Sequence, residues 1–141
     1  TIVQSNEKII FPIHPRTKKQ LNKFDLMKKL VKSKNVKILD SIGYFEILEL
    51  MKKSSFILTD SGGLQEEATS SQIRKKTFVI RKTTDRPESV EHGFSELIGT
   101  SSNKLKSVLK NGHDSKIPSK KSPYGDGKAT EKILKEIYNR F

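Results

Sequence analysis

Cysteine is absent from this chain of 141 residues, and long apolar runs are absent as well. Without cysteine the chain can form neither a disulfide framework nor a metal site with thiolate ligands. No stretch approaches the ~20 apolar residues that a membrane-spanning helix needs, and no signal-peptide pattern opens the sequence. Histidine is scarce too, with three scattered residues, so we expect no zinc site. These absences predict a soluble domain located in the cytoplasm.

Acidic residues are outnumbered by basic ones, and the formal net charge is +12. Such an excess is compatible with binding to nucleic acid. The distribution argues against it, because lysines crowd residues 8–37 and 104–121 while residues 40–67 are net acidic. Aromatic residues do not interleave with the lysines, and no helix-turn-helix, RNA-recognition or zinc-finger pattern occurs. We therefore favour lysine-rich, solvated helix faces and keep a basic nucleic-acid binder as the weaker alternative.

Short apolar runs recur at roughly even intervals along the chain and predict β-strands. They lie at residues 8–13, 36–39, 55–59, 77–81 and 95–99. Between them the apolar residues have helical spacing, as in Tyr44, Ile47, Leu48 and Met51. Strands that alternate with helices predict an α/β fold with a Rossmann-like parallel sheet flanked by helices. Residues 1–141 are enough for one such domain, and no internal repeat is present.

The last third of the chain has a different composition. Residues 111–127 are rich in Lys, Ser, Pro and Gly, and they predict a surface loop. Residues 128–141 predict a terminal helix with an apolar stripe. Such a stripe must pack on a partner surface, which is either the sheet of this domain or a neighbouring domain.

The stretch LTDSGGLQEEA, residues 58–68, places two glycines where a predicted strand ends and a helix starts. In open parallel sheets, ligands bind beyond the carboxyl ends of the strands. Gly62 and Gly63 carry no Cβ, so a ligand can approach the backbone closely. The first N–H groups of the helix and its dipole suit a diphosphate. The alternative is an ordinary strand-to-helix turn capped by Asp60 or Ser61.

Charged side chains accompany this turn at the same predicted edge of the sheet. Glu66 and Glu67 interact favourably with the helix dipole, but one of them also suits a sugar diol. Arg86 begins another predicted helix, where a guanidinium can complete an anion site. His14 ends the first predicted strand. The simpler interpretations are a solvated arginine and a structural histidine.

Several segments share their order and spacing with one known family. They are FPIHPRT (11–17), GYFEILELMKKSSFILTDSGGLQEEA (43–68), RKTTDRPESVEHG (81–93), LIGT (97–100) and PYGDGKA (123–129). Together they resemble the C-terminal half of the non-hydrolysing UDP-N-acetylglucosamine 2-epimerases. The combination of TDSGG-QEEA with TT-RPE is far more specific than either glycine alone.

The resemblance implies a nucleotide-binding domain that forms one half of a two-domain architecture of the GT-B type. The implied UDP-binding residues are His14, Ile47, Ser61, Gly62, Gly63, Glu67 and Arg86. The serine and the glycines would meet the diphosphate, and the glutamate would bind the ribose hydroxyls. The arginine and the histidine would lie on the phosphate side, and the backbone around the isoleucine would border the uracil. No metal or redox cofactor is implied.

The implied reaction interconverts UDP-N-acetylglucosamine and UDP-N-acetylmannosamine by elimination and re-addition of UDP, in cell-surface polysaccharide biosynthesis. The family's acid/base carboxylates and the histidine of its HRRE-like motif belong to the preceding part of the family's sequence, and none is present here. We therefore expect no catalytic residue in this chain, no activity without the N-terminal domain, and a possible homodimer of the full-length protein. The alternatives are a stand-alone UDP-sugar-binding or regulatory module and half of a GT-B glycosyltransferase.

One connection departs from the family pattern. The family runs from QEEA through a short turn with Gly-Lys-Pro, whereas residues 69–77 read TSSQIRKKT and lack both the glycine and the proline. The connection is about two residues longer than in the family, so the resemblance does not fix the exact aim of Arg86.

Overall fold

The computed structural model describes residues 1–140 and contains five short strands. They are β1 (Ile9–Pro12), β2 (Val36–Leu39), β3 (Ile57–Thr59), β4 (Thr77–Val79) and β5 (Ser95–Leu97). Each strand lies within one of the five apolar runs of the sequence, and every recorded pairing is parallel. The predicted α/β fold is therefore confirmed.

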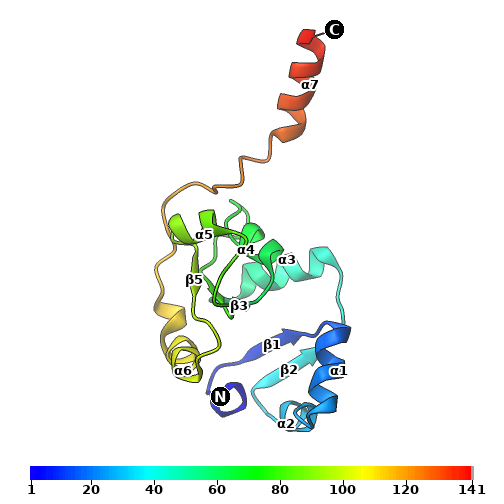
Figure 1. Ribbon diagram of the computed structural model, residues 1–141, viewed down its shortest axis with the longest axis vertical. Coiled ribbons are helices and arrows are strands. Elements are labelled where there is room, and N and C mark those ends of the chain that lie inside the picture. The colour runs from blue at the N-terminus through cyan, green and yellow to red at the C-terminus, as the bar shows by residue number, and fades with distance from the viewer. Residues whose placement is uncertain (141) are drawn as a thin grey trace.

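Helices connect the strands and follow the last one (Figure 1). They are α1 (Pro15–Lys23), α2 (Met27–Val31), α3 (Tyr44–Lys53), α4 (Gly62–Glu67), α5 (Pro87–Glu91), α6 (Ser102–Asn111) and α7 (Ala129–Arg140). Short 3₁₀ turns occupy Ile2–Gln4 and Gly112–Asp114. No helix among residues 1–140 is long and apolar enough to cross a membrane.

The strands are divided between two sheets, where the sequence pattern predicts one. β1 pairs with β2, and a separate sheet has the order β3-β4-β5. In the view of Figure 1, β1 lies between β2 and the three-stranded sheet. Within the described residues no hydrogen bond joins β1 to β3. His14 follows β1 and Ser61 follows β3, so these two predicted site residues follow strands of different sheets.

The hydrophobic core is centred on the three-stranded sheet. One cluster joins α3 to β3 and the end of α4, through Met51, Ile57, Ala68 and Ile73. A second cluster joins β4, β5 and α6, through Phe78, Ile98 and Val108. Burying one such apolar side chain contributes roughly 1.5–3 kcal/mol. This packing therefore fixes β3 and β4, and with them the first residues of the turns that follow these two strands.

The segment 111–127 is mostly irregular, but it begins with a 3₁₀ turn at Gly112. A Cβ on Gly112 would lie 3.1 Å from ring atoms of Phe56 and 3.2 Å from Phe78. These two rings meet edge to face with centroids 5.6 Å apart. The start of the segment is therefore ordered because a backbone without a side chain packs directly on aromatic rings.

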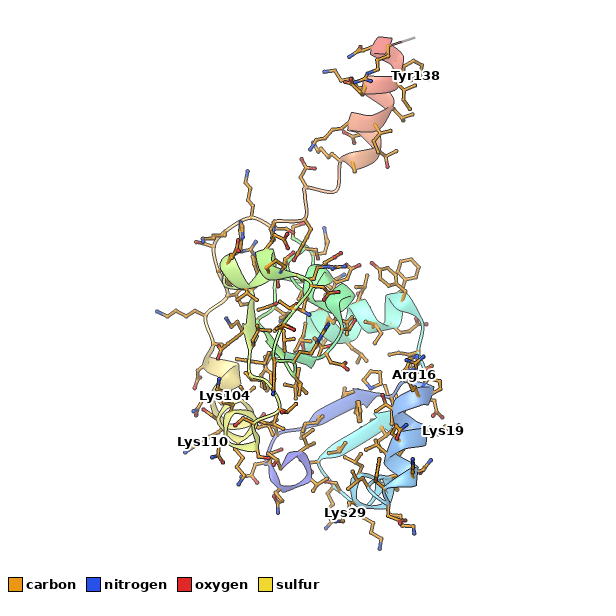
Figure 2. All side chains as sticks on the ribbon, viewed as in Figure 1. Arg16, Lys19, Lys29, Lys104, Lys110 and Tyr138 are labelled. Carbon is orange, nitrogen blue, oxygen red and sulfur yellow. The ribbon has the colours of Figure 1, made fainter. Side chains whose placement is uncertain are left out.

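Helix α7 extends away from the sheets, as Figure 1 shows. None of its residues is buried, and the exposed fraction of Tyr138, labelled in Figure 2, is 80%. Its other exposed apolar residues are Ile133, Leu134 and Ile137. The apolar stripe of α7 therefore does not pack on the sheets of this chain.

Candidate functional site

The turn that follows β3 starts α4 through two side-chain hydrogen bonds. Thr59 Oγ1 accepts from the Ser61 N–H at 3.0 Å, and Ser61 Oγ accepts from the third N–H of α4 at 3.5 Å. Ser61 is therefore the N-cap of the helix. The N–H groups of Gly62 and Gly63 have no intrahelical partner, and no described side chain accepts from them. Two backbone donors at the carboxyl end of β3 thus have no acceptor among the described residues.

The loop after β4 meets this turn at Gly62. A Cβ on Gly62 would lie 3.0 Å from Oδ1 of Asp85, whereas the nearest atom to a Cβ on Gly63 would be Ser61 Oγ at 3.9 Å. Gly62 therefore permits the approach of Asp85, and the space beside Gly63 is open. A negative group already stands at this helix N-terminus, where the dipole favours it.

Arg86 lies beside α4 and is paired with acids. Its Nε donates to Glu66 Oε1, and its Nη1 donates to the Asp85 carbonyl at 2.8 Å and lies 3.4 Å from Asp85 Oδ2. The hydrogen bond to the Glu66 carboxylate raises the pKa of Arg86 above its ordinary value. No described residue accepts from Nη2. Glu66 therefore holds the guanidinium while one of its nitrogens is still available to a ligand.

Glu67 has a different partner from its neighbour Glu66. Its Oε1 accepts a hydrogen bond from the Tyr44 hydroxyl at 2.5 Å. The bond to this carboxylate raises the pKa of Tyr44, so the phenol stays protonated over the physiological range. Tyr44 is exposed at the start of α3. Together the two side chains offer a carboxylate and a hydroxyl oxygen on the surface, a combination that suits a sugar diol.

Helical spacing in the sequence assigned Tyr44 to the apolar face of a helix, and this contact was missed. The partners are 23 positions apart, so periodicity gives no signal for it. The only feature of the sequence that indicates this contact is a residue with a hydroxyl group at the first position of the helix.

Gln65 is the buried link between the two loops, and it too was missed. Its side chain is inaccessible to solvent. Its Nε2 donates to the Ser61 carbonyl at 3.2 Å, and its Oε1 accepts from the Thr84 hydroxyl at 2.7 Å. Thr84 Oγ1 in turn accepts from the Arg86 N–H at 3.1 Å. Gln65 therefore fixes the turn after β3 relative to the loop that carries Arg86.

Replacing this link is expected to destabilise the protein. In Gln65→Ala the Thr84 hydroxyl loses its acceptor, and the Ser61 carbonyl keeps only the backbone N–H of residue 65. Leaving a buried polar group without its partner costs about 1–3 kcal/mol. Urea unfolding of both proteins measures the difference in the free energy of unfolding. The matched control is Gln72→Ala at an exposed position, expected to change it by less than about 0.5 kcal/mol. Equal effects of the two substitutions would contradict the link.

His14 and Ile47 are not joined to this group. His14 is exposed, and its Nδ1 accepts from the Arg16 N–H at 3.2 Å as the N-cap of α1. Ile47 packs against the core cluster of α3 and β3, and its N–H already donates to the Gly43 carbonyl at 3.1 Å. A uracil contact at Ile47 would therefore use its carbonyl or side chain. No described hydrogen bond links either residue to Ser61, Glu67 or Arg86.

The arrangement is chemically suited to a nucleoside diphosphate. Unpartnered amides and one guanidinium nitrogen can bind an anion, and the Tyr44–Glu67 pair can bind hydroxyls. Within residues 1–140 no group of three or more His, Asp or Glu side chains could hold a metal ion. Of the carboxylates at this edge, those of Glu66 and Asp85 are paired with arginine and that of Glu67 with tyrosine.

Comparisons with known proteins agree with this chemistry. The family model described as UDP-N-acetylglucosamine 2-epimerase matches residues 1–138. The UDP-N-acetylglucosamine 2-epimerase of Methanocaldococcus jannaschii is 43% identical over 127 residues, which are 90% of this chain and 34% of that protein. The enzyme of Escherichia coli is 36% identical over 138 residues, which are 93% of this chain and 35% of that protein.

Solved structures give the same result. The Methanocaldococcus jannaschii epimerase in complex with UDP-GlcNAc and UDP has a TM-score of 0.81 at 42% identity, over 92% of this chain and 35% of that one. The Neisseria meningitidis epimerase bound to UDP-GlcNAc has a TM-score of 0.75 at 31% identity, over 92% of this chain and 36% of that one. This chain spans about a third of the length of these relatives. It belongs to the UDP-N-acetylglucosamine 2-epimerase family.

Proposed function

We propose that residues 1–141 are the UDP-binding half of an enzyme that interconverts UDP-N-acetylglucosamine and UDP-N-acetylmannosamine. One observation carries the proposal: the 42%-identical relative with a TM-score of 0.81 was solved in complex with UDP-GlcNAc and UDP. The carboxyl edge of β3 and β4 supplies groups of matching chemistry. In this reaction UDP leaves and is added back, so the nucleotide must be held throughout.

The diphosphate is assigned to the turn at Ser61, Gly62 and Gly63. The Gly63 side is open, since the nearest atom to a Cβ placed on this residue would be 3.9 Å away, whereas Asp85 stands beside Gly62. The phosphates therefore approach over Gly63, away from the Asp85 carboxylate. The available Nη2 of Arg86 completes the anion site from the neighbouring loop. Fixed donors of this kind stabilise the charge that develops on a departing diphosphate.

The nucleoside is assigned to residues on the other side of α4. Glu67, oriented by Tyr44, binds the ribose hydroxyls, and Ile47 borders the uracil. Both Tyr44 and Ile47 belong to the first turns of α3, so one helix start would position the ribose and the base together. His14 lies on the phosphate side in the proposal, at the carboxyl end of the other sheet.

A second domain is part of the proposal, because the relatives are about three times as long as this chain. That domain supplies the proton transfers at the sugar. It also covers the exposed apolar stripe of α7, which finds no partner on the described sheets. A homodimer of the full-length protein and a cytoplasmic location rest on the family membership alone.

A basic nucleic-acid binder is the weaker candidate. Figure 2 shows Arg16, Lys19 and Lys29 on one side of the molecule and Lys104 and Lys110 of α6 on the other. These labelled basic residues thus lie on separate helices at two sides of the molecule, which argues against one basic stripe that follows a phosphate backbone.

Titration of the full-length protein with UDP, uridine and an unrelated oligonucleotide tests the proposal. UDP is expected to bind at least about tenfold more tightly than uridine, since one charge-assisted hydrogen bond contributes about 1.5–3 kcal/mol. Gly63→Ala should abolish this preference by closing the open space, while stability is unchanged or slightly raised because alanine favours helices. The control is Ser102→Ala at the start of α6, expected to leave UDP affinity unchanged. An oligonucleotide complex that outcompetes UDP and survives raised salt would overturn the proposal.

A further inference from the structure

We propose that the outer face of α1 and α2 binds the surface of an anionic lipid bilayer, so that the protein associates reversibly with a membrane without spanning it. The inference rests on charge and exposure at one edge of the molecule, and it is independent of the proposed UDP site. This surface, the basic face, consists of Arg16, Lys19, Lys23, Lys28, Lys29 and Lys32.

Helical spacing places the α1 part of the basic face on one side of that helix. Arg16, Lys19 and Lys23 are three and four residues apart, so their side chains leave the helix in the same direction. Leu21 lies on the opposite side and is the one residue of α1 that is half-buried, whereas all the others are exposed. Helix α1 therefore rests on the domain through Leu21 and presents the three basic side chains to solvent.

Helix α2 continues the basic face. Lys28, Lys29 and Lys32 are exposed and lie within one and a half turns of each other, while Met27 and Leu30 on the other side are half-buried. Figure 1 shows α1 and α2 next to each other at the edge of the molecule beyond β2. The two helices therefore form one continuous exposed surface.

The positive charge of this surface is not balanced within the fold. Asp25, in the turn between the two helices, is the only acidic residue among residues 8–39, and its Oδ1 accepts from Lys28 Nζ at 3.0 Å. The turn is tight, because the Leu26 N–H donates to the Leu21 carbonyl at 2.9 Å. Among residues 1–140, no carboxylate lies within ion-pair distance of the other five basic residues of this face.

The arrangement reduces the stability of the helices that carry it. Like charges one turn apart repel each other on a helix. Neither helix has an acidic residue in its first turn, where the helix dipole favours one, and neither has a buried residue that would compensate. The concentration of positive charge therefore indicates an anionic partner outside the chain.

Apolar side chains are exposed among these lysines. The exposed fraction is 62% for Phe24 and 67% for Val31. Lys23 Nζ lies 5.8 Å from the centroid of the Phe24 ring, and Val31 lies one turn after Lys28. A lysine can bury its methylene groups beside apolar surface while its ammonium group reaches a phosphate. Lysines interspersed with exposed apolar side chains are typical of segments that lie on membrane surfaces.

A bilayer explains these features better than a nucleic acid. Eight of the nine basic residues in 15–37 are lysines. The hydrated point charge of lysine suits a diffuse field of headgroups, whereas arginine binds single phosphates with two parallel hydrogen bonds. A phosphate backbone offers Val31 no apolar surface, but the acyl boundary of a bilayer does. Figure 2 shows Arg16, Lys19 and Lys29 on one side of the molecule, so a flat surface can meet them together.

Sedimentation of the full-length protein with lipid vesicles tests the proposal. Phosphatidylcholine vesicles that contain about 30% phosphatidylglycerol are expected to bind the protein at least about tenfold more tightly than vesicles of phosphatidylcholine alone, and raised salt should remove the difference. Each lysine near an anionic surface strengthens binding about fivefold. The triple variant Lys19→Ala/Lys23→Ala/Lys29→Ala is therefore expected to bind the anionic vesicles about a hundredfold more weakly.

The matched control removes the same charge from α6, in the triple variant Lys104→Ala/Lys106→Ala/Lys110→Ala. These lysines are exposed on the other side of the molecule, so vesicle affinity should change less than about threefold. Urea unfolding should show unchanged stability in both triple variants, because all six lysines are exposed. An equal loss of vesicle affinity in the two triple variants, or equal binding of the parent to both kinds of vesicle, would overturn the proposal.

Val31→Asn distinguishes a bilayer from other polyanions. Burying a valine side chain strengthens binding up to about tenfold. This variant is therefore expected to bind the anionic vesicles about three- to tenfold more weakly and to keep the parent's affinity for an oligonucleotide. Unchanged vesicle affinity in Val31→Asn would overturn the bilayer contact and leave only unspecific attraction between charges. An oligonucleotide that binds more tightly than the anionic vesicles, and is lost in the variant of α1 and α2, would identify a nucleic-acid surface instead.

Discussion

Residues 1–141 alone are expected to form no UDP-N-acetylmannosamine from UDP-N-acetylglucosamine. The reaction must remove a weakly acidic proton from C2 of the sugar and deliver another to the opposite face, which requires a positioned base and acid. The carboxylates of Glu66, Glu67 and Asp85 are engaged by arginine or tyrosine side chains. Each positioned acid or base contributes about 10²–10⁴-fold to a rate, so the loss relative to the full-length enzyme should exceed about 10⁴-fold.

Proton NMR in deuterated water measures this loss, because turnover replaces the C2 proton with deuterium even at equilibrium. The full-length protein is the positive control, and UDP titration of the short chain shows whether the nucleotide still binds. Exchange at C2 by residues 1–141 at a rate near that of the full-length protein would contradict the prediction. It would place the proton-transfer groups among the carboxylates of this domain.

The strands could be predicted from the sequence because each is a short apolar run bounded by polar residues. The division into two sheets could not be predicted, because no local pattern in residues 8–13 or 55–59 indicates which strands pair. The half-buried state of β1 has the same origin, since its residues are as apolar as those of β4 but have fewer neighbours.

Parts of the site that depend on local turn chemistry were also predictable. Ser61 caps α4 through a hydrogen bond within three residues, which the spacing of DSGGLQ indicates. The contacts of Gln65 and Tyr44 were not predictable, because Thr84 and Glu67 lie 19 and 23 positions away from them. The apolar stripe of α7 could likewise be predicted from helical periodicity, but the surface that covers this stripe could not.

His14 shows how the divided sheet affects the site. The sequence places it at the carboxyl edge beside Ser61, and the structure places it at the end of β1, in the sheet that contains only β1 and β2. The assignment of His14 to the phosphate side therefore stays a prediction, because no described hydrogen bond links it to Ser61 or Arg86.

Glu67→Ala in the full-length protein is expected to weaken UDP binding about 10- to 150-fold. The substitution removes a hydrogen bond that involves a charged group, which contributes roughly 1.5–3 kcal/mol. Binding of 2′,3′-dideoxy-UDP should barely change, because that analogue lacks the hydroxyls that the carboxylate would bind. Arg86→Ala should weaken UDP and its dideoxy analogue alike and reduce the preference for UDP over uridine. Calorimetric titration of each variant with the three ligands measures these differences.

A substitution at Tyr44 tests the ribose assignment more specifically. Its hydroxyl orients the Glu67 carboxylate at 2.5 Å, so Tyr44→Phe keeps the aromatic ring and removes only the orienting bond. We expect a smaller loss of UDP affinity than in Glu67→Ala, again absent for the dideoxy analogue. The matched control is Tyr138→Phe on α7, which is exposed and remote from the turn, and it should leave both affinities unchanged.

The competing explanation is that Glu67 only stabilises α4 and accepts the hydrogen bond from Tyr44, without contact to a ligand. In that case Glu67→Ala and Tyr44→Phe would each cause a small loss of stability, and UDP and dideoxy-UDP would be affected equally. The difference between the two ligands therefore separates a contact with the ribose from a structural effect on α4, since any distortion of the helix weakens both. Equal losses for UDP and dideoxy-UDP in Glu67→Ala would reject the ribose assignment and leave the diphosphate turn as the only part of the site supported by binding.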